Sequence, residues 1–209
     1  MVDLDAGVQY ASLDTLANTP VDDVLATLDA PVADYRQLYY RWERQQWEAG
    51  AIDFAADREQ WRSLDASMRR SLLWWIAPFY VGEEQVTNSL VSFVDAAPTE
   101  EQGVFLTTQL VDEARHTVFL DRFVDEVVGD SGDGMGDRLR AQEPRLDGGL
   151  RRLLLEELPA VAERIRAQDD GDHSALVEGV VLYHILIEGA LALAGQRFLL
   201  NFLRDNELL

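Results

Sequence analysis

Nearly every segment of this chain repeats its apolar residues at the spacing of an α-helix, and no segment shows the convincing alternation of a β-strand. Helices of this length, joined by short loops, bury their apolar faces against one another. The sequence therefore predicts an all-α helical bundle, with Pro78 and Pro159 kinking two of its helices. The helices are expected at residues 34–49, 66–96, 98–128, 149–168 and 174–204.

The segments between these helices are expected to be irregular. Residues 1–31 have a mixed composition and contain Pro20 and Pro31, which predicts an irregular N-terminal arm. Residues 52–61 are expected to form a loop, and the Gly/Asp-rich residues 129–136 a flexible linker. Residues 32–209 would then form a single bundle domain.

Composition excludes several classes of function. The chain of 209 residues is 47% hydrophobic, which is enough for a real core. It contains no Cys, so it has no disulfide and no thiolate metal site. A net charge of -20 argues against nucleic acid and anionic membranes as partners. The N-terminus has no signal-peptide pattern, and we expect a cytoplasmic protein.

The least polar stretch, residues 179–195, raises the question of a membrane span. His184 and Glu188 interrupt it, and it is too short to cross a bilayer comfortably. We interpret it as a buried helix and expect no membrane span.

The sequence contains one Glu-x-x-His pair, Glu113 and His116, inside a predicted helix. Residues three apart share a helical face, so the carboxylate and the imidazole can bind one ion. Such a pair also occurs by chance on solvated helices. Apolar neighbours on or beside the same stripe indicate that this pair points inward.

Two further glutamates, Glu83 and Glu188, lie in apolar helical segments. A buried carboxylate must be protonated, paired with a cation or bound to a metal. If Glu188 binds no metal, the alternative is an ion pair with an Arg in the core. If Glu83 binds no metal, the alternative is that Glu83 and Glu84 form a polar face of the helix that is turned to solvent.

The order along the chain is Glu, then Glu-x-x-His, then Glu, each on its own long helix. Ferritin-like dimetal proteins build their site from two single Glu and two Glu-x-x-His pairs on four helices. Three of these four contributions occur here. Oxygen and imidazole ligands without thiolate suit iron or manganese.

The sequence resembles the ribonucleotide reductase small-subunit superfamily, most closely its ligand-binding oxidase branch, over roughly residues 45–200. The stretch from Trp47 to Trp61 looks like the entry to the family's first ligand helix. The other matching motifs are Gly82–Thr87 (Gly-Glu-Glu-x-Val-Thr), Glu113–His116 and Tyr183–Gly189 (Tyr-x4-Glu-Gly). The resemblance implies a ferritin-like bundle with metal ligands Glu83, Glu113, His116 and Glu188.

Two positions favour the oxidase branch. The reductase usually has its radical Tyr four residues after the first ligand His, where this chain has Leu120. The oxidase branch has a Val and a Tyr that its metal centre joins by an ether cross-link, and these correspond to Val86 and Tyr183. In the plain alternative, Val86 is a core residue and Tyr183 a buried, hydrogen-bonded tyrosine.

The family's second Glu-x-x-His pair has no counterpart in the sequence. His184 is preceded at that spacing by Val181, and His173 by Asp170. The chain thus supplies only part of a six-ligand site, either as a fragment of a longer protein or as a degenerate relative. We favour a fragment that lacks the last ligand helix.

The resemblance implies an oxidase with a Mn/Fe or Fe/Fe centre, which activates O2 for a two-electron oxidation and holds a long-chain, fatty acid-like ligand. It also implies a homodimer. The alternatives are a reductase radical subunit and a non-catalytic bundle that binds metal or lipid at an incomplete site.

Overall fold

The computed structural model describes residues 33–130, 132–169 and 171–208, and all their regular secondary structure is helical. The chain divides into two units, Met1–Asp34 and Tyr35–Leu209, and the described elements lie in the second. The arm predicted at residues 1–31 lies outside the described residues. The predicted all-α fold is confirmed for the described residues of the second unit.

The five predicted helices are present, three of them with π-helical segments at an end or in the middle. The first and third are α3 (Tyr35–Arg44) and α6 (Glu100–Phe123), and α6 continues into η2 (Val124–Val128). The second is α5 (Ala66–Asp95), which runs through Pro78 without a break. The fourth is α8 (Gly148–Arg152), η4 (Leu153–Glu157) and α9 (Leu158–Ala167), and the fifth is α10 (Ser174–Val180), η5 (Val181–Ala192) and α11 (Leu193–Asp205).

Two of the predicted irregular segments are partly helical. The expected loop at residues 52–61 contains α4 (Ala55–Ser63), whose Trp61 is buried. The last two residues of the predicted linker, 135 and 136, begin α7 (Met135–Gln142), which a 3-10 turn, η3 (Glu143–Arg145), follows. Another 3-10 turn, η1 (Ala49–Ala51), follows α3. Helices this short are marginal on their own, so tertiary packing decides whether they form.

Helices α5 and α6 both begin with side-chain caps. The Asp65 carboxylate accepts hydrogen bonds of 2.8 Å from the backbone N–H groups of Ser67 and Met68 at the start of α5. The Thr99 hydroxyl caps α6 in the same way by accepting from the N–H of Gln102. Both helices therefore start at positions that the sequence sets locally.

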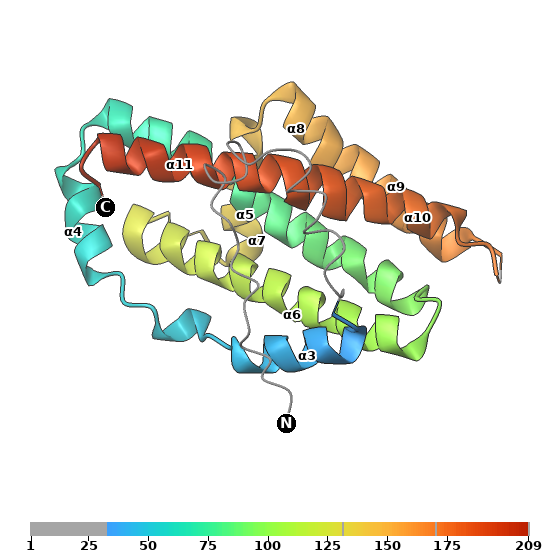
Figure 1. Cartoon of the computed structure of the whole chain (residues 1–209). Coiled ribbons are helices and arrows are strands. Elements are labelled where there is room, and N and C mark those ends of the chain that lie inside the picture. The colour runs from blue at the N-terminus through green and yellow to red at the C-terminus, as the bar shows by residue number, and fades with distance from the viewer. Residues whose placement is uncertain (1–32, 131, 170, 209) are drawn as a thin grey trace, which may run out of the picture. The chain divides into compact units, whose positions relative to one another are not determined.

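Helix α5 is the centre of the unit. It packs along α6 on one side and against α9 on the other, while α3 lies along α6 (Figure 1). Its residues contribute to two apolar clusters, one with α9 and α10 and one with α4 and η2. The buried Tyr80 donates a 2.5 Å hydrogen bond to Asp121, which also accepts two bonds of 2.7 Å from Arg138. This network fixes α5, α6 and α7 together just before Glu83.

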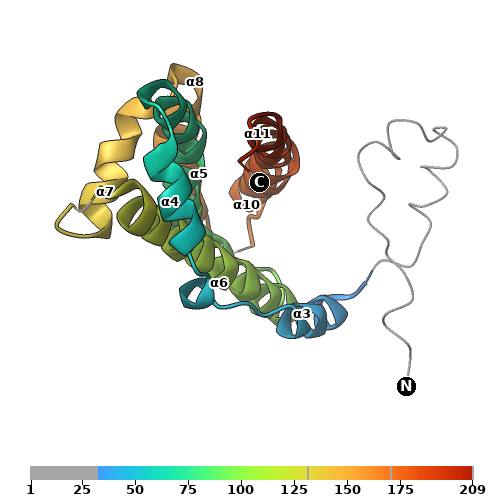
Figure 2. The same ribbon diagram turned by 90° about the vertical axis from the view of Figure 1, so that its left-hand side faces the viewer.

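The C-terminal helix, α10–η5–α11, is exposed over much of its surface, and the prediction of a buried helix there is wrong. Ser174–Asp205 is long and apolar enough to cross a membrane, and only 22% of its most apolar window is buried. Its start packs on α9, and Leu199, Phe202 and Leu203 of α11 pack against the cluster that contains α4 and η2. Figure 2 views this helix nearly along its axis. Length and composition alone are weak evidence for a membrane span, because core helices of soluble bundles share them.

Candidate metal centre

Three of the four predicted ligands converge between α5 and α6. His116 Nδ1 lies 3.1 Å from Glu113 Oε2, one turn earlier on α6, and 3.2 Å from Glu83 Oε2 on α5. The three ligand atoms all lie within 4.8 Å of one another, close enough for one cation. The inward orientation predicted for the Glu-x-x-His pair holds for Glu113, which is 6% exposed, but only in part for His116, whose side chain is 41% exposed.

Tyr183 brings the C-terminal helix to the same centre. Its hydroxyl donates a 2.7 Å hydrogen bond to Glu113 Oε1, the oxygen that His116 does not contact. The Tyr183 ring is buried, with its edge against Phe93. Glu113 is therefore held by two groups at once, and its orientation is fixed before any metal arrives.

The charges of the three groups are strongly interdependent. Burial raises the pKa of Glu113, but hydrogen bonds with His116, Glu83 and Tyr183 outweigh it and lower the pKa to about 2. Burial raises the pKa of Glu83 to about 8. Burial lowers the pKa of His116, yet its bonds to Glu113 and Glu83 raise the pKa to about 10. The hydrogen bonds and burial of the metal-free centre thus favour an ionised Glu113 and favour protons on His116 and Glu83.

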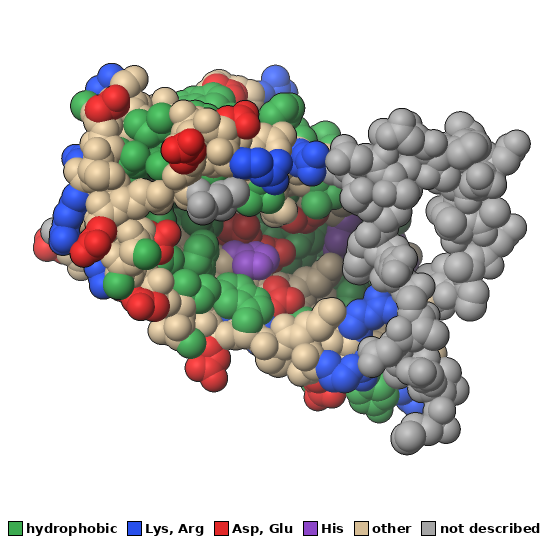
Figure 3. All heavy atoms as spheres, turned by 60° about the vertical axis from the view of Figure 1, so that its left-hand side comes forward, with side chains coloured by type: hydrophobic (Ala, Val, Ile, Leu, Met, Phe, Trp, Pro, Cys, Tyr) green, Lys and Arg blue, Asp and Glu red, His purple; other side chains and the backbone are tan. Residues whose placement is uncertain are grey.

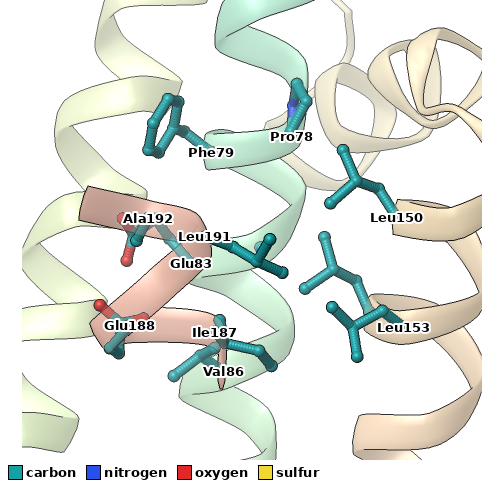
Figure 4. A pocket seen from close by; sticks show the side chains of 12 residues that line it. Pro78, Phe79, Glu83, Val86, Leu150, Leu153, Ile187, Glu188, Leu191 and Ala192 are labelled. Carbon is teal, nitrogen blue, oxygen red and sulfur yellow. The ribbon is translucent and has the colours of Figure 1, made fainter. Parts of the chain in front are cut away.

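Glu188, the fourth predicted ligand, lies beside this group and not in it. It comes from η5, where the chain makes wider π-helical turns, a feature often found at functional sites. Burial, then the charge of Glu113, raises its pKa to about 7. With Glu83 it lines a cavity of about 80 Å³, and both carboxylates lie opposite Leu150 and Leu153 (Figure 4). Its role as a ligand stays a prediction.

Val86 and Tyr183, the predicted cross-link partners, belong to one apolar cluster. Val86 is 2% exposed, lies one turn after Glu83 and lines the same small cavity (Figure 4). The structure contains no bond between them, and their cross-linking stays a prediction.

Sequence reasoning did not assign a role to Trp47 at this centre. Its indole stacks on the His116 imidazole, with ring centroids 5.9 Å apart and planes 22° apart. It follows α3, far from His116 in the sequence, so no local spacing could reveal the contact. The stack restricts the rotation of the most exposed of the three ligands.

The donor set fits iron or manganese. Carboxylate oxygens and one imidazole nitrogen are the donors that these metals accept, and no thiolate competes because the chain has no Cys. Two divalent cations would offset the ionised carboxylates of Glu83, Glu113 and Glu188. The described residues supply one Glu-x-x-His pair, whereas a complete ferritin-like site uses two.

The comparisons with known proteins agree with this fold. No family model matches the sequence. A mutant R2-like ligand-binding oxidase with an aerobically reconstituted Mn/Fe cofactor is 27% identical, with a TM-score of 0.73 over 90% of this chain and 66% of that one. Another structure of an R2-like ligand-binding oxidase with this cofactor is 28% identical, with a TM-score of 0.67 over 80% and 55% of the two chains.

A third structure shows likeness of fold alone. The R2-like ligand-binding oxidase from Sulfolobus acidocaldarius is 24% identical, with a TM-score of 0.74 over 84% of this chain and 62% of that one. The chain thus has the all-α, ferritin-like fold of R2-like ligand-binding oxidases and spans 55–66% of the length of these three structures. The structural similarity implied by the sequence motifs is confirmed.

Proposed function

We propose that this chain supplies part of a dimetal carboxylate centre, with Mn and Fe or with two Fe, that activates O2 for a two-electron oxidation. The observation that carries the proposal is the convergence of Glu83, Glu113 and His116 from two helices, with the Tyr183 hydroxyl on Glu113. A buried cluster of this kind has a high cost without a cation. The similarity to R2-like oxidases with Mn/Fe cofactors supports the choice of metals.

Each residue has a distinct task in this proposal. Glu83, Glu113 and His116 hold metal, and Glu188 approaches as a further carboxylate ligand. The bound metals would supply O2 binding and electron transfer. The chain must release the protons held by His116 and Glu83 when metal binds, because only the free bases are ligands.

The small cavity beside the carboxylates supports a ligand with a polar head and an apolar chain. Glu83 and Glu188 lie at one side of it, and leucines form the other. A second cavity of about 100 Å³ shares Pro78, Phe79 and Leu150 with the first and continues toward Trp74. We propose that a fatty acid-like ligand places its carboxylate near the metals and its chain along this path.

The positions of Val86 and Tyr183 support the proposed ether cross-link. Both side chains are buried beside the ligands, in one cluster. The link forms a C–O bond between a Val86 carbon and the Tyr183 oxygen and removes one hydrogen from each, with O2 accepting the two electrons. The position after His116 where a reductase carries its radical Tyr is Leu120, which packs in the other apolar cluster.

A non-catalytic metal- or lipid-binding bundle is the second candidate, and the partial ligand set favours it. Oxygen uptake by the Fe- and Mn-loaded protein separates the two functions, since a binding protein takes up metal without consuming O2.

Metal binding itself is tested by anaerobic equilibrium dialysis with Fe²⁺ or Mn²⁺, followed by elemental analysis. Glu113→Gln is expected to lower the metal bound per chain, because it removes a ligand that faces His116. Glu101→Gln, in the exposed first turn of the same helix, is the matched control and should bind as the original chain does. Equal binding by Glu113→Gln and the original chain would refute the assignment.

A further inference from the structure

The two cavities of the proposed ligand path follow one another along α5. The first, of about 80 Å³, is lined by Glu83 and Glu188 of the candidate metal centre. The second, of about 100 Å³, is lined by Trp74 and Trp75. The residues that line both cavities are Pro78, Phe79 and Leu150. A ligand that fills both cavities therefore runs from the carboxylates to the two tryptophans.

Three segments line the cavities in the same order. On α5 the lining residues recur every three or four positions and run from residue 86 at the metal end back to residue 74. The C-terminal helix runs from residue 187 to residue 195, and the α8 region from residue 154 back to residue 145. Figure 4 shows the metal end of the path, with Glu188 at one side of the view and Phe79 at the other.

The path reaches the candidate metal centre from one side of α5. The His116 side chain, on α6, is 41% exposed. Figure 3 shows histidine and acidic side chains on the floor of a hollow that hydrophobic side chains border. No described residue of α6 lines either cavity of the path. A ligand in the path therefore approaches the centre from the side of α8 and η4, and not from the side of α6.

The length of the path corresponds to a short alkyl chain. Glu83 and Trp74 lie nine residues apart on α5, which is about 13 Å at about 1.5 Å per residue. An extended chain of carbon–carbon single bonds advances about 1.3 Å per bond, so about ten carbons span this distance. The side chains between the two ends are apolar, with Leu150 and Leu153 opposite α5 (Figure 4).

The far end of the path is polar. Arg145 and Asp147 line the second cavity together with the tryptophans. Arg145 is half-buried, and its Nε donates a 3.0 Å hydrogen bond to Oε1 of the fully buried Gln142. Among the described residues, Gln142 is the one hydrogen-bond partner of this guanidinium. The bond holds the guanidinium through Nε and leaves its two terminal nitrogens for another acceptor.

Arg145 differs from the arginines near it in the sequence. Arg138, Arg140 and Arg152 each form an ion pair with an Asp or Glu. Within the part of the chain that the structure describes, no carboxylate lies within ion-pair distance of Arg145. Asp147 instead caps α8, because its Oδ1 accepts hydrogen bonds of 2.8 and 2.9 Å from two backbone N–H groups. The guanidinium of Arg145 is thus available to a carboxylate from a ligand.

A purely apolar chain suits this end of the path poorly. A chain longer than the path would have to pass a charged guanidinium and enter water. A carboxylate at the end of the chain instead accepts two parallel hydrogen bonds from the guanidinium, a geometry for which arginine is well suited. The metal end already requires a carboxylate in the proposed function. These two requirements define a ligand that has a carboxylate at each end.

We propose that the ligand is an α,ω-dicarboxylic acid of about ten carbons, with one carboxylate at the metals and the other on Arg145. This inference rests on the proposed metal centre and ligand path. Arg145 selects for the second carboxylate and also for chain length, because its bond to Gln142 fixes where the guanidinium lies. The net charge of -20 opposes a second ligand carboxylate, so a preference for the diacid requires a local cationic partner.

The test compares ligands by isothermal titration calorimetry on the full chain loaded with Mn²⁺. Decanedioic acid should bind at least about tenfold more tightly than decanoic acid, which has the same number of carbons and a single carboxylate. Hexanedioic acid spans only about half of the path and should bind no more tightly than decanoic acid. ω-Hydroxydecanoic acid should bind less tightly than decanedioic acid, because a hydroxyl forms no bidentate pair with a guanidinium.

Arg145→Gln and Arg152→Gln form a matched pair of chain variants. Both remove one positive charge from the same region, but Arg152 is exposed and lines neither cavity. Arg145→Gln should reduce the preference for decanedioic acid to less than about twofold, and Arg152→Gln should leave it unchanged. Circular dichroism shows whether the variants are folded. The ligand series on the original chain decides the proposal even where Arg145→Gln does not fold.

The outcomes separate this inference from the proposed function. Equal binding of decanoic and decanedioic acids overturns the role of Arg145 and leaves the metal centre and the ligand path standing. Tighter binding of the hydroxy acid than of the diacid overturns the second carboxylate and assigns the far end to a hydroxyl. Retention of Mn²⁺ without binding of any of these acids overturns the ligand path, and failure to retain Mn²⁺ overturns the metal centre, and this inference falls with either.

Discussion

Replacing Glu83 with Gln should make the metal-free protein less sensitive to high pH. Burial raises the pKa of Glu83 from 4.5 to about 8, so the folded state holds a proton that the unfolded state has already lost. Between these two pH values the free energy of unfolding falls as pH rises, because the folded protein binds more protons than the unfolded chain. A glutamine side chain at this position has no proton to lose, which removes this contribution.

The magnitude follows from the pKa shift. At about 1.36 kcal/mol per pH unit, the shift to about 8 corresponds to roughly 5 kcal/mol. Water that reaches the half-exposed His116 screens part of this energy, and we expect roughly 2 kcal/mol to be measured. The loss of one His116 partner acts in the same direction, since the raised pKa of His116 also gives stability that is lost at high pH.

Urea unfolding followed by circular dichroism, in the presence of a chelator, measures this effect at about pH 5 and about pH 9. The original chain should lose roughly 2 kcal/mol more stability between the two conditions than Glu83→Gln. Glu84→Gln, the neighbouring carboxylate on α5, is the control and should behave as the original chain. Equal pH dependence of the original chain and Glu83→Gln would refute the buried, proton-holding role of Glu83.

Two further predictions concern the C-terminal helix. Gly179→Ala should destabilise the protein by about 1–3 kcal/mol in urea unfolding, because the added Cβ would lie 2.7 Å from Phe93 Cζ. Gly148→Ala, where a Cβ meets nothing within 4 Å, should cost less than the Gly179 change. After loading with Mn, Fe and O2, peptide mass spectrometry should find Val86 and Tyr183 peptides joined with the loss of two hydrogens. Unlinked peptides after full loading would favour the metal- or lipid-binding function instead.

The sequence by itself determined the long helices and most of the residues of the candidate metal centre. Apolar spacing located α5, the α6–η2 helix and α8–α9 to within about two residues, because amphipathic period and local caps are properties of neighbouring residues. Glu83 and the Glu113/His116 pair were identifiable because a carboxylate inside an apolar helical stripe requires a partner. The resemblance to the R2-like fold rested on the same linked motifs.

Only the tertiary structure decided how these helices meet. The short helices α4 and α7, the Trp47 stack on His116 and the hydrogen bond from Tyr183 to Glu113 depend on contacts between distant segments. The exposure of the C-terminal helix also depends on contacts between segments that are distant in the sequence. Its composition predicts burial, but burial requires apolar neighbours on every side. The described residues supply such neighbours on one side of the helix, and residues such as Val181 and Ile185 on its other side stay exposed.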